Sequence, residues 1–230
     1  MSVHAQSFKN LAFGQANPVI DTSSPYYPYA VTTASALPDW TAYIDTVSQS
    51  DIFLNTYGEG AAQVDIFSPS FPAAGYPGTS LNPGTIGIGY TVLLQSGGDQ
   101  FNGVGGPLVS ASISQYGTVP QGDQSLVFNA WETPWTEFSV SFDGNNLTPV
   151  ALGSGANYTS YGVNISSYAG DPGTLEFTAL YNNAANAGVS WLGLEGIEFS
   201  QTSVPEPGIV AMTAIGGLLF AARKWFARHC

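Results

Sequence analysis

The stretch Ser125–Leu147 reads S-L-V-F-N-A-W-E-T-P-W-T-E-F-S-V-S-F-D-G-N-N-L. Apolar residues alternate with polar ones on both sides of a Pro-containing break, which is the period of a half-buried β-strand. Leu126, Phe128 and Ala130 share one face of the first strand. After the break, Phe138, Val140 and Phe142 share one face of a second strand, and Asp143-Gly144-Asn145 is typical of a tight hairpin turn. We therefore expect the first and second strands to form a hairpin through Glu132-Thr133-Pro134.

The rest of the chain before residue 204 repeats this pattern of short strands and turns. The full chain has fifteen prolines and 27 glycines, most of them in this part, and no convincing helical period is found here. A change of phase in the last strand predicts a bulge at Glu195-Gly196. Together the strands predict an all-β fold, a β-sandwich of the jelly-roll type covering residues 7–203. Further strands are expected at residues 7–13, 40–44, 51–55, 63–67, 86–94, 110–116, 158–165, 174–181 and 189–200, with a long loop over residues 68–85.

The charges are distributed unevenly along the chain. The formal net charge is −12, and between residues 10 and 222 there is no Lys or Arg. Nucleic acid is excluded as a partner because phosphates need cationic side chains. Attraction of this domain by charge to an anionic membrane is excluded for the same reason. The one cysteine, Cys230, allows no disulfide within the chain.

Catalytic chemistry is restricted by what the chain lacks. Its two histidines, His4 and His229, lie near the chain ends. A Ser-His-Asp triad, a Cys-His pair, a Schiff-base lysine and a histidine-ligated metal are therefore unavailable to the domain. Only carboxylates remain as acid and base groups, so we predict no catalytic site. A glycosidase with a pair of acids is the remaining enzyme alternative.

The C-terminal stretch, residues 204–230, has a different composition. From Gly208 to Ala222 it carries no charge, and Arg223, Lys224 and Arg228 follow. A membrane span needs roughly 20 apolar residues for a core of ~30 Å, and residues 225–227 can lengthen this one while the basic side chains reach the head groups. We expect one transmembrane helix with its basic end on the cytoplasmic side. The alternative, a buried helix of the domain, would not be uniformly apolar and then abruptly basic.

The motif at the start of this stretch resembles a known sorting signal. Pro205, Glu206 and Pro207, followed by an apolar helix and basic residues, are similar to the bacterial PEP-CTERM tail. The resemblance covers residues 204–228. It implies export, recognition and cleavage by an exosortase, membrane anchoring until cleavage, and then a place at the cell surface or outside the cell.

Such a protein is expected to have a secretion signal as well. Residues 1–6 lack its basic and apolar regions, but Val3-His4-Ala5 places small residues as a signal-peptidase site does. We interpret residues 1–6 as the remainder of a cleavage region whose signal is encoded upstream. A chance match is the alternative.

The domain itself resembles the galactose-binding-like jelly rolls found in many PEP-CTERM proteins. The resemblance rests on F-K-N-L-A-F, S-I-S-Q-Y-G-T-V-P and L-E-G-I-E-F-S, which begin at Phe8, Ser112 and Leu194. It implies a surface role, in some relatives with carbohydrate as ligand, and in many a structural Ca²⁺. No D-x-[DN]-x-[DN]-G loop is present, so no metal ligands are assigned and no other cofactor is expected.

A glycan-binding surface is the one binding site that the sequence suggests. Trp131, Trp135 and Glu137 share the outward phase around the 132–134 turn. Aromatic faces stack on sugars and carboxylates accept hydrogen bonds from hydroxyl groups. The alternative is that the tryptophans pack under a neighbouring loop, whereas Trp40 and Trp191 are expected in the core. The sequence thus predicts a structural or adhesive surface protein, with a carbohydrate-binding module that contacts extracellular polysaccharide as the alternative.

Overall fold

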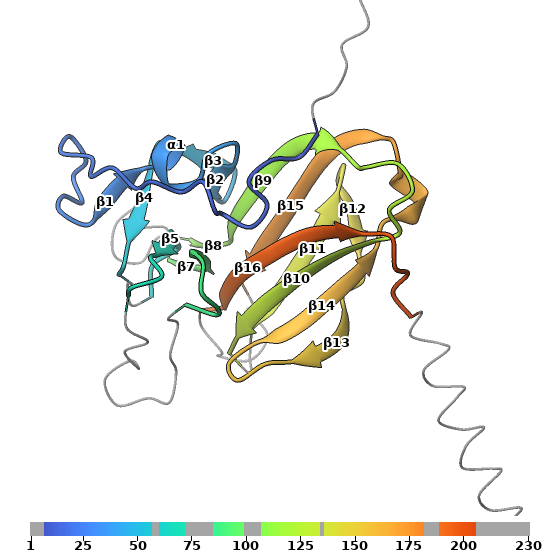
Figure 1. Ribbon diagram of the computed structural model, residues 1–230. Coiled ribbons are helices and arrows are strands. Elements are labelled where there is room, and N and C mark those ends of the chain that lie inside the picture. The colour runs from blue at the N-terminus through green and yellow to red at the C-terminus, as the bar shows by residue number, and fades with distance from the viewer. Residues whose placement is uncertain are drawn as a thin grey trace, which may run out of the picture.

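The computed structural model describes residues 7–56, 60–71, 85–98, 107–133, 136–181 and 189–205. In this part of the chain two β-sheets face each other as a sandwich, and the short helix α1, Thr33–Ala36, lies at one end (Figure 1). A 3₁₀ turn, η2, spans Ser166–Tyr168. The expectation of an all-β sandwich is therefore confirmed.

The larger sheet has eight strands in the order β1-β4-β5-β6-β16-β10-β14-β13. All described pairs in it are antiparallel except β4 with β5. Its strands are β1 Ala30–Thr32, β4 Asp51–Leu54, β5 Gln63–Phe67, β6 Thr91–Gln95, β10 Ser125–Glu132, β13 Val150–Ser154, β14 Thr159–Asn164 and β16 Trp191–Ser200.

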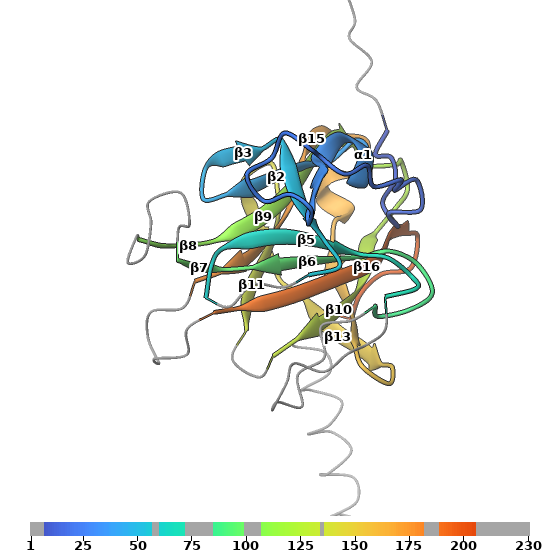
Figure 2. The same cartoon turned by 90° about the vertical axis from the view of Figure 1, so that its left-hand side faces the viewer.

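The smaller sheet has six strands in the order β12-β11-β15-β9-β2-β3. The β2–β3 hairpin lies at one end of the sandwich, where β2 contacts β5 of the larger sheet (Figure 2). Its strands are β2 Thr41–Ile44, β3 Val47–Gln49, β9 Ala111–Thr118, β11 Glu137–Phe142, β12 Asn145–Leu147 and β15 Pro172–Leu180; a separate small ribbon pairs β7 Gly97–Gly98 with β8 Leu108–Val109.

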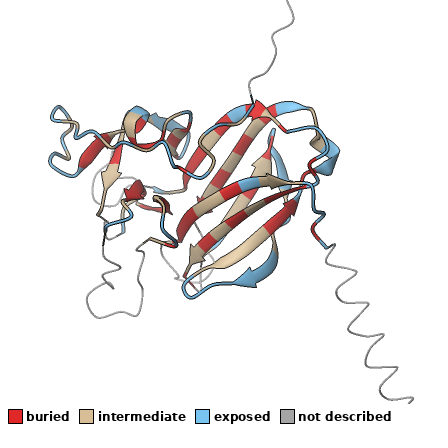
Figure 3. Cartoon of the chain, viewed as in Figure 1, coloured by how far each residue is buried: buried red, intermediate tan, exposed pale blue. Residues whose placement is uncertain are grey.

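The main core lies between the two sheets. Phe128 and Phe177 meet edge to face at 5.1 Å from opposite sheets, and Trp40 packs on Phe177 at 6.4 Å. Leu126, Phe128 and Ala130 all point inward, as their alternation predicts. The central strands are largely buried, whereas β13 at the sheet edge is exposed (Figure 3).

The connection between β10 and β11 differs from the prediction. β10 belongs to the eight-stranded sheet and β11 to the six-stranded sheet, so the chain crosses from one sheet to the other at residues 133–136. The predicted hairpin is wrong because strand alternation reveals which side chains are buried but not which neighbour a strand pairs with. The side chains of Phe138, Val140 and Phe142 nevertheless face the core, as expected.

Two other local predictions are confirmed. Asp143 and Gly144 both have positive φ, 48° and 76°, and they join β11 to β12. This is the backbone geometry of a two-residue hairpin turn. At the predicted bulge, Gly196 has φ 63°, and the β10–β16 register shifts between Val127 and Asn129.

Two predicted strands are shorter or absent. Residues 7–13 form turns with an isolated bridge at Ser7 in place of a strand. In the predicted strand at 86–94, only Thr91 onward is extended, and Ile88 is 97% exposed. The reason is Glu195, whose carboxylate accepts hydrogen bonds from the Gly87 N–H at 2.6 Å and the Gly89 N–H at 3.0 Å. These backbone groups are thereby satisfied without a strand partner.

A second, small apolar cluster lies on the outer face of the larger sheet. Phe67, Leu93 and Trp191 are buried there, with Trp131 packed against them. Asp65 shares the outward phase of Phe67 on β5 and is fully buried. Alternating strands thus bury residues on both faces of this sheet around β5, β6 and β16.

The chain leaves the sandwich at Val204. After β16, the Ser125 hydroxyl donates to the Thr202 carbonyl at 2.7 Å, and Val204 is buried against Gly162. Pro205 is exposed. Among the described residues, no helix has the length and apolarity for a membrane crossing. The predicted helix at residues 208–222 lies outside the described residues.

Candidate functional site

A shallow depression opens at the end of the sandwich where β10 passes into β11. Its volume is about 410 Å³, and we call it the Tyr161 depression. It collects side chains from both sheets and from the link between β12 and β13. Its lining residues are Thr136, Glu137, Phe138, Pro149, Tyr161 and Leu180.

Tyr161 is held in place by aromatic packing and by a carboxylate. Its ring lies 5.7 Å from that of Phe128 and 5.5 Å from that of Phe138. Its hydroxyl donates a short hydrogen bond to the Glu132 carboxylate. Burial, followed by this hydrogen bond and the charge of Glu132, raises the pKa of Tyr161 to about 12. The phenol therefore stays protonated at neutral pH.

The crossing between the sheets is anchored beside the depression. The Thr133 N–H donates to Thr136 Oγ1 at 3.0 Å, and the Thr136 hydroxyl donates to the Trp191 carbonyl at 2.9 Å. The Glu137 N–H donates to the Ser190 hydroxyl at 3.2 Å. Ser190 and Trp191 thus hold the end of the crossing at Thr136 and Glu137, and Glu137 begins β11 from a defined position.

This arrangement suits an open ligand better than an enclosed one. Phe138 and Tyr161 supply apolar ring surface, and Glu137 is an exposed carboxylate beside them. Rings contact the C–H faces of sugars, and carboxylates accept hydrogen bonds from hydroxyl groups. A shallow surface that carries two aromatic rings and one carboxylate can bind part of a neutral polymer.

Two of the residues that were predicted to form one glycan-binding surface belong to strands of different sheets. Trp131 points outward, as its phase predicts, but it lies on the outer face of the larger sheet and is half-buried. Its ring packs against Trp191 at 6.3 Å. Glu137 lines the Tyr161 depression on the other sheet, and Trp135 lies outside the described residues. Trp131 belongs to β10 and Glu137 to β11, and both lie beside the Ser190–Trp191 segment. A shared glycan-binding surface of these residues stays a prediction.

The other aromatic predictions have mixed outcomes. Trp40 is in the core, at 4% exposure. Trp191 is buried, but in the outer cluster.

Sequence reasoning did not find Tyr161, Phe138 or Glu132 as neighbours. Tyr161 shares the inward phase of Val163, and both belong to β14. A phenol at an inward position needs a hydrogen-bond acceptor when buried, and that need was the available signal. Which acceptor it meets depends on the β10–β14 pairing, in which Phe128 lies opposite Tyr161.

A second depression surrounds the point at which the chain leaves the sandwich. Its volume is about 350 Å³, and we call it the exit groove. Its lining is rich in hydroxyl and amide groups and contains no charged side chain. The lining residues are Asn146, Leu147, Thr148, Val150, Asn164, Ser166, Ser167, Tyr168, Val204 and Pro205.

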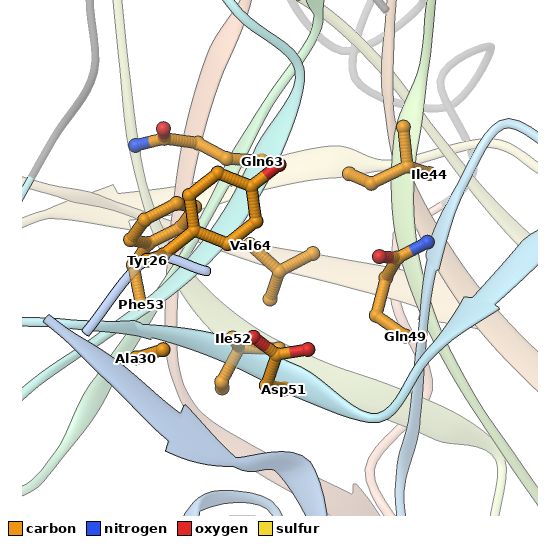
Figure 4. Close-up of a pocket in the computed structure, with 9 residues that line it drawn as sticks. All are labelled: Tyr26, Ala30, Ile44, Gln49, Asp51, Ile52, Phe53, Gln63 and Val64. Carbon is orange, nitrogen blue, oxygen red and sulfur yellow. The ribbon is translucent and has the colours of Figure 1, made fainter. Parts of the chain in front are cut away.

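A third cavity lies between β3, β4 and β5 (Figure 4). Tyr26, Gln49 and Asp51 are among the residues around it. Its volume of about 20 Å³ is room for about one water molecule. The cavity is therefore too small for a sugar or a cofactor.

The remaining predicted sites concern metals and the sorting motif. In the part of the chain that the structure describes, no group of His, Cys, Asp and Glu side chains could hold a metal ion. The structural Ca²⁺ stays a prediction. Of the sorting motif, Pro205 is described and lies on the rim of the exit groove. Glu206, Pro207, Arg223, Lys224 and Arg228 lie outside the described residues.

Comparisons with known proteins identify no family. No protein-family model matches the chain, and no curated protein matches it. The enzymatically active domain of tailspike protein 4 from bacteriophage CBA120 aligns at 13% identity and a TM-score of 0.40, over 85% of this chain and 21% of the tailspike chain. The K1 cleaved adhesin domain of Lys-gingipain from Porphyromonas gingivalis W83 aligns at 11% identity and a TM-score of 0.38, over 76% of this chain and 98% of that domain. This chain thus spans about a fifth of the length of the tailspike chain.

Proposed function

We propose that this chain is an exported bacterial surface or matrix protein with a structural or adhesive role and no catalytic site. Its C-terminal stretch acts as a PEP-CTERM signal that an exosortase and the export machinery recognise. The observation that carries the proposal is the junction at Val204. Val204 is the last buried residue in the described part of the chain, and the sorting motif begins at the next residue, Pro205.

The distribution of charge supports the same proposal. Residues 10–222 contain no Lys or Arg, while Arg223, Lys224 and Arg228 follow the apolar stretch. A basic end beyond an apolar span stays on the cytoplasmic side, which leaves the anionic domain outside. We also propose that the sandwich is a jelly roll, because β9 to β11 and β14 to β16 pass alternately between the two sheets.

Fractionation of cells that produce the protein tests the sorting proposal. Glu206→Ala is expected to leave the chain in the membrane fraction with its C-terminus intact, whereas the wild type reaches the surface. Glu198→Ala, an exposed carboxylate on β16, is the matched control and should behave as the wild type does. Equal sorting of wild type and Glu206→Ala would remove the motif from the proposal.

Carbohydrate binding is the second candidate function, and the Tyr161 depression favours it. Two rings and an exposed carboxylate meet there on an open surface, which suits extracellular polysaccharide. On a glycan array the wild type should bind neutral glycans, and Glu137→Gln should weaken that binding. Glu198→Gln provides the control for a change of charge. Absence of binding by the wild type, or equal binding by both variants, refutes this candidate.

A further inference from the structure

The junction between domain and tail is short and held tightly. Val204 packs on Gly162, and a Cβ atom at Gly162 would lie 2.7 Å from Val204 Cγ2. Upstream, the Thr202 carbonyl accepts from Ser125 at 2.7 Å and the Thr202 N–H donates to Ser200 Oγ at 3.1 Å. The domain therefore holds the chain as far as Val204.

The apolar stretch begins soon after this anchor. Residues 205–207 separate Val204 from Gly208. A fully extended chain spans at most about 3.5 Å per residue, so this link reaches roughly 14 Å across its peptide steps. If the stretch crosses a membrane, as the proposed function requires, the domain lies next to the lipid head groups, with the exit groove nearest to them.

The lining of that groove differs in charge from the rest of the domain. From residue 144 to residue 170 the chain has no charged side chain, although its net charge is −12. This segment forms β12 to β14 and η2, and it supplies the lining of the exit groove apart from Val204 and Pro205. Asn146, Asn164, Ser166 and Ser167 are exposed on it. Asp143 and Asp171 mark its two limits in the sequence.

Charge explains why such a face suits this position. Carboxylates within a Debye length of about 10 Å are repelled by anionic lipid. Hydroxyl and amide groups are uncharged and are not repelled, and they can form hydrogen bonds with head groups and their water. A tether this short would otherwise force an anionic domain against a surface that repels it.

We propose that the charge-free face, residues 144–170 around the exit groove, rests against the lipid head groups while the tail spans the membrane. The contact orients the domain, so that the opposite edge of the six-stranded sheet, β3, faces away from the membrane. This inference rests on the proposed membrane-spanning role of the tail. It adds a defined partner, the lipid surface, and a defined face of the domain.

Fluorescence quenching on the full chain in phosphatidylcholine vesicles tests the orientation. In a Cys230→Ser background, Asn146→Cys on β12 and Ser48→Cys on β3 place one dye at either edge of the same sheet. Both positions are exposed. Head-group spin-labelled lipid should quench the dye at residue 146 several-fold more than the dye at residue 48. Equal quenching of the two dyes, in chains that float with the vesicles, overturns the inference and leaves the tail proposal intact.

Added charge provides the second test. Ser166→Glu combined with Ser167→Glu should reduce the quenching at residue 146 in vesicles that contain phosphatidylglycerol, and salt should restore it. Quenching unchanged by these substitutions contradicts the charge argument. Chains that do not float with vesicles at all overturn both the membrane-spanning tail and the inference that rests on it.

Discussion

Asp65 provides the sharpest prediction about stability. Its side chain is fully buried on β5, and Gln63 Nε2 donates a hydrogen bond of 2.6 Å to Oδ2. Among the described residues, Oδ1 has no hydrogen-bond partner. Burial raises the pKa of Asp65 well above its ordinary value, and the bond from Gln63 only partly opposes this. Between the unfolded pKa and the raised folded pKa, the folded state therefore holds a proton that the unfolded state has released.

The sign and size of the pH dependence follow from that difference in protonation. Above the unfolded pKa and below the folded pKa, the folded state binds one more proton than the unfolded state. The free energy of unfolding then falls by about 1.4 kcal/mol for each pH unit of rise. Asp65→Asn removes this contribution, because the amide is neutral at every pH and its oxygen still accepts from Gln63.

Urea unfolding of residues 7–205, followed by tryptophan fluorescence, measures the effect. This fragment contains every described strand. As the pH rises above the unfolded pKa of about 4, the wild type should lose stability relative to Asp65→Asn with the slope given above, until the folded pKa is reached. Asp171→Asn, an exposed aspartate, serves as the control. Parallel pH curves for wild type and Asp65→Asn would refute the reasoning.

Three further substitutions test other contacts. Gly162→Val introduces a side chain where Val204 packs, and the overcrowding should lower the free energy of unfolding by about 1–3 kcal/mol. Urea unfolding that matches the wild type would contradict the packing of Val204 on Gly162. Tyr161→Phe leaves the Glu132 carboxylate without its phenol donor and should lower the free energy of unfolding by about 1 kcal/mol in the same assay. An unchanged urea midpoint argues against that hydrogen bond. Glu195→Gln weakens the charge-assisted hydrogen bonds to the loop before β6. The backbone amides of Gly87 and Gly89 should then exchange hydrogen faster, as measured by NMR. Unaltered exchange would show that the carboxylate does not hold the loop.

The sequence predicted the faces of strands better than their partners. Leu126, Phe128 and Ala130 are buried because alternation alone determines which side faces the core. Sheet membership depends on distant contacts. Thr136 bonds to Trp191, which lies 55 residues away, and this contact fixes the crossing between the sheets. No local pattern contains that information.

The candidate site was predicted only in part for the same reason. Glu137 lines a depression, but its neighbours Tyr161 and Pro149 come from segments beyond the next turn. Trp131 has the predicted outward phase, yet this sheet buries its outer face near β6 and β16. An outward position therefore did not mean an exposed one. The turn at Asp143-Gly144 was predictable because its backbone geometry depends on local residues.

Peptide mapping of the C-terminus in cells that produce the protein tests the central claim most directly. We predict that chains at the cell surface or outside the cell end near Pro205-Glu206-Pro207, and that membrane precursors retain the residues up to Cys230. Released chains that still carry the peptide from Trp225 to Cys230 would contradict the claim that this stretch is a cleaved sorting signal.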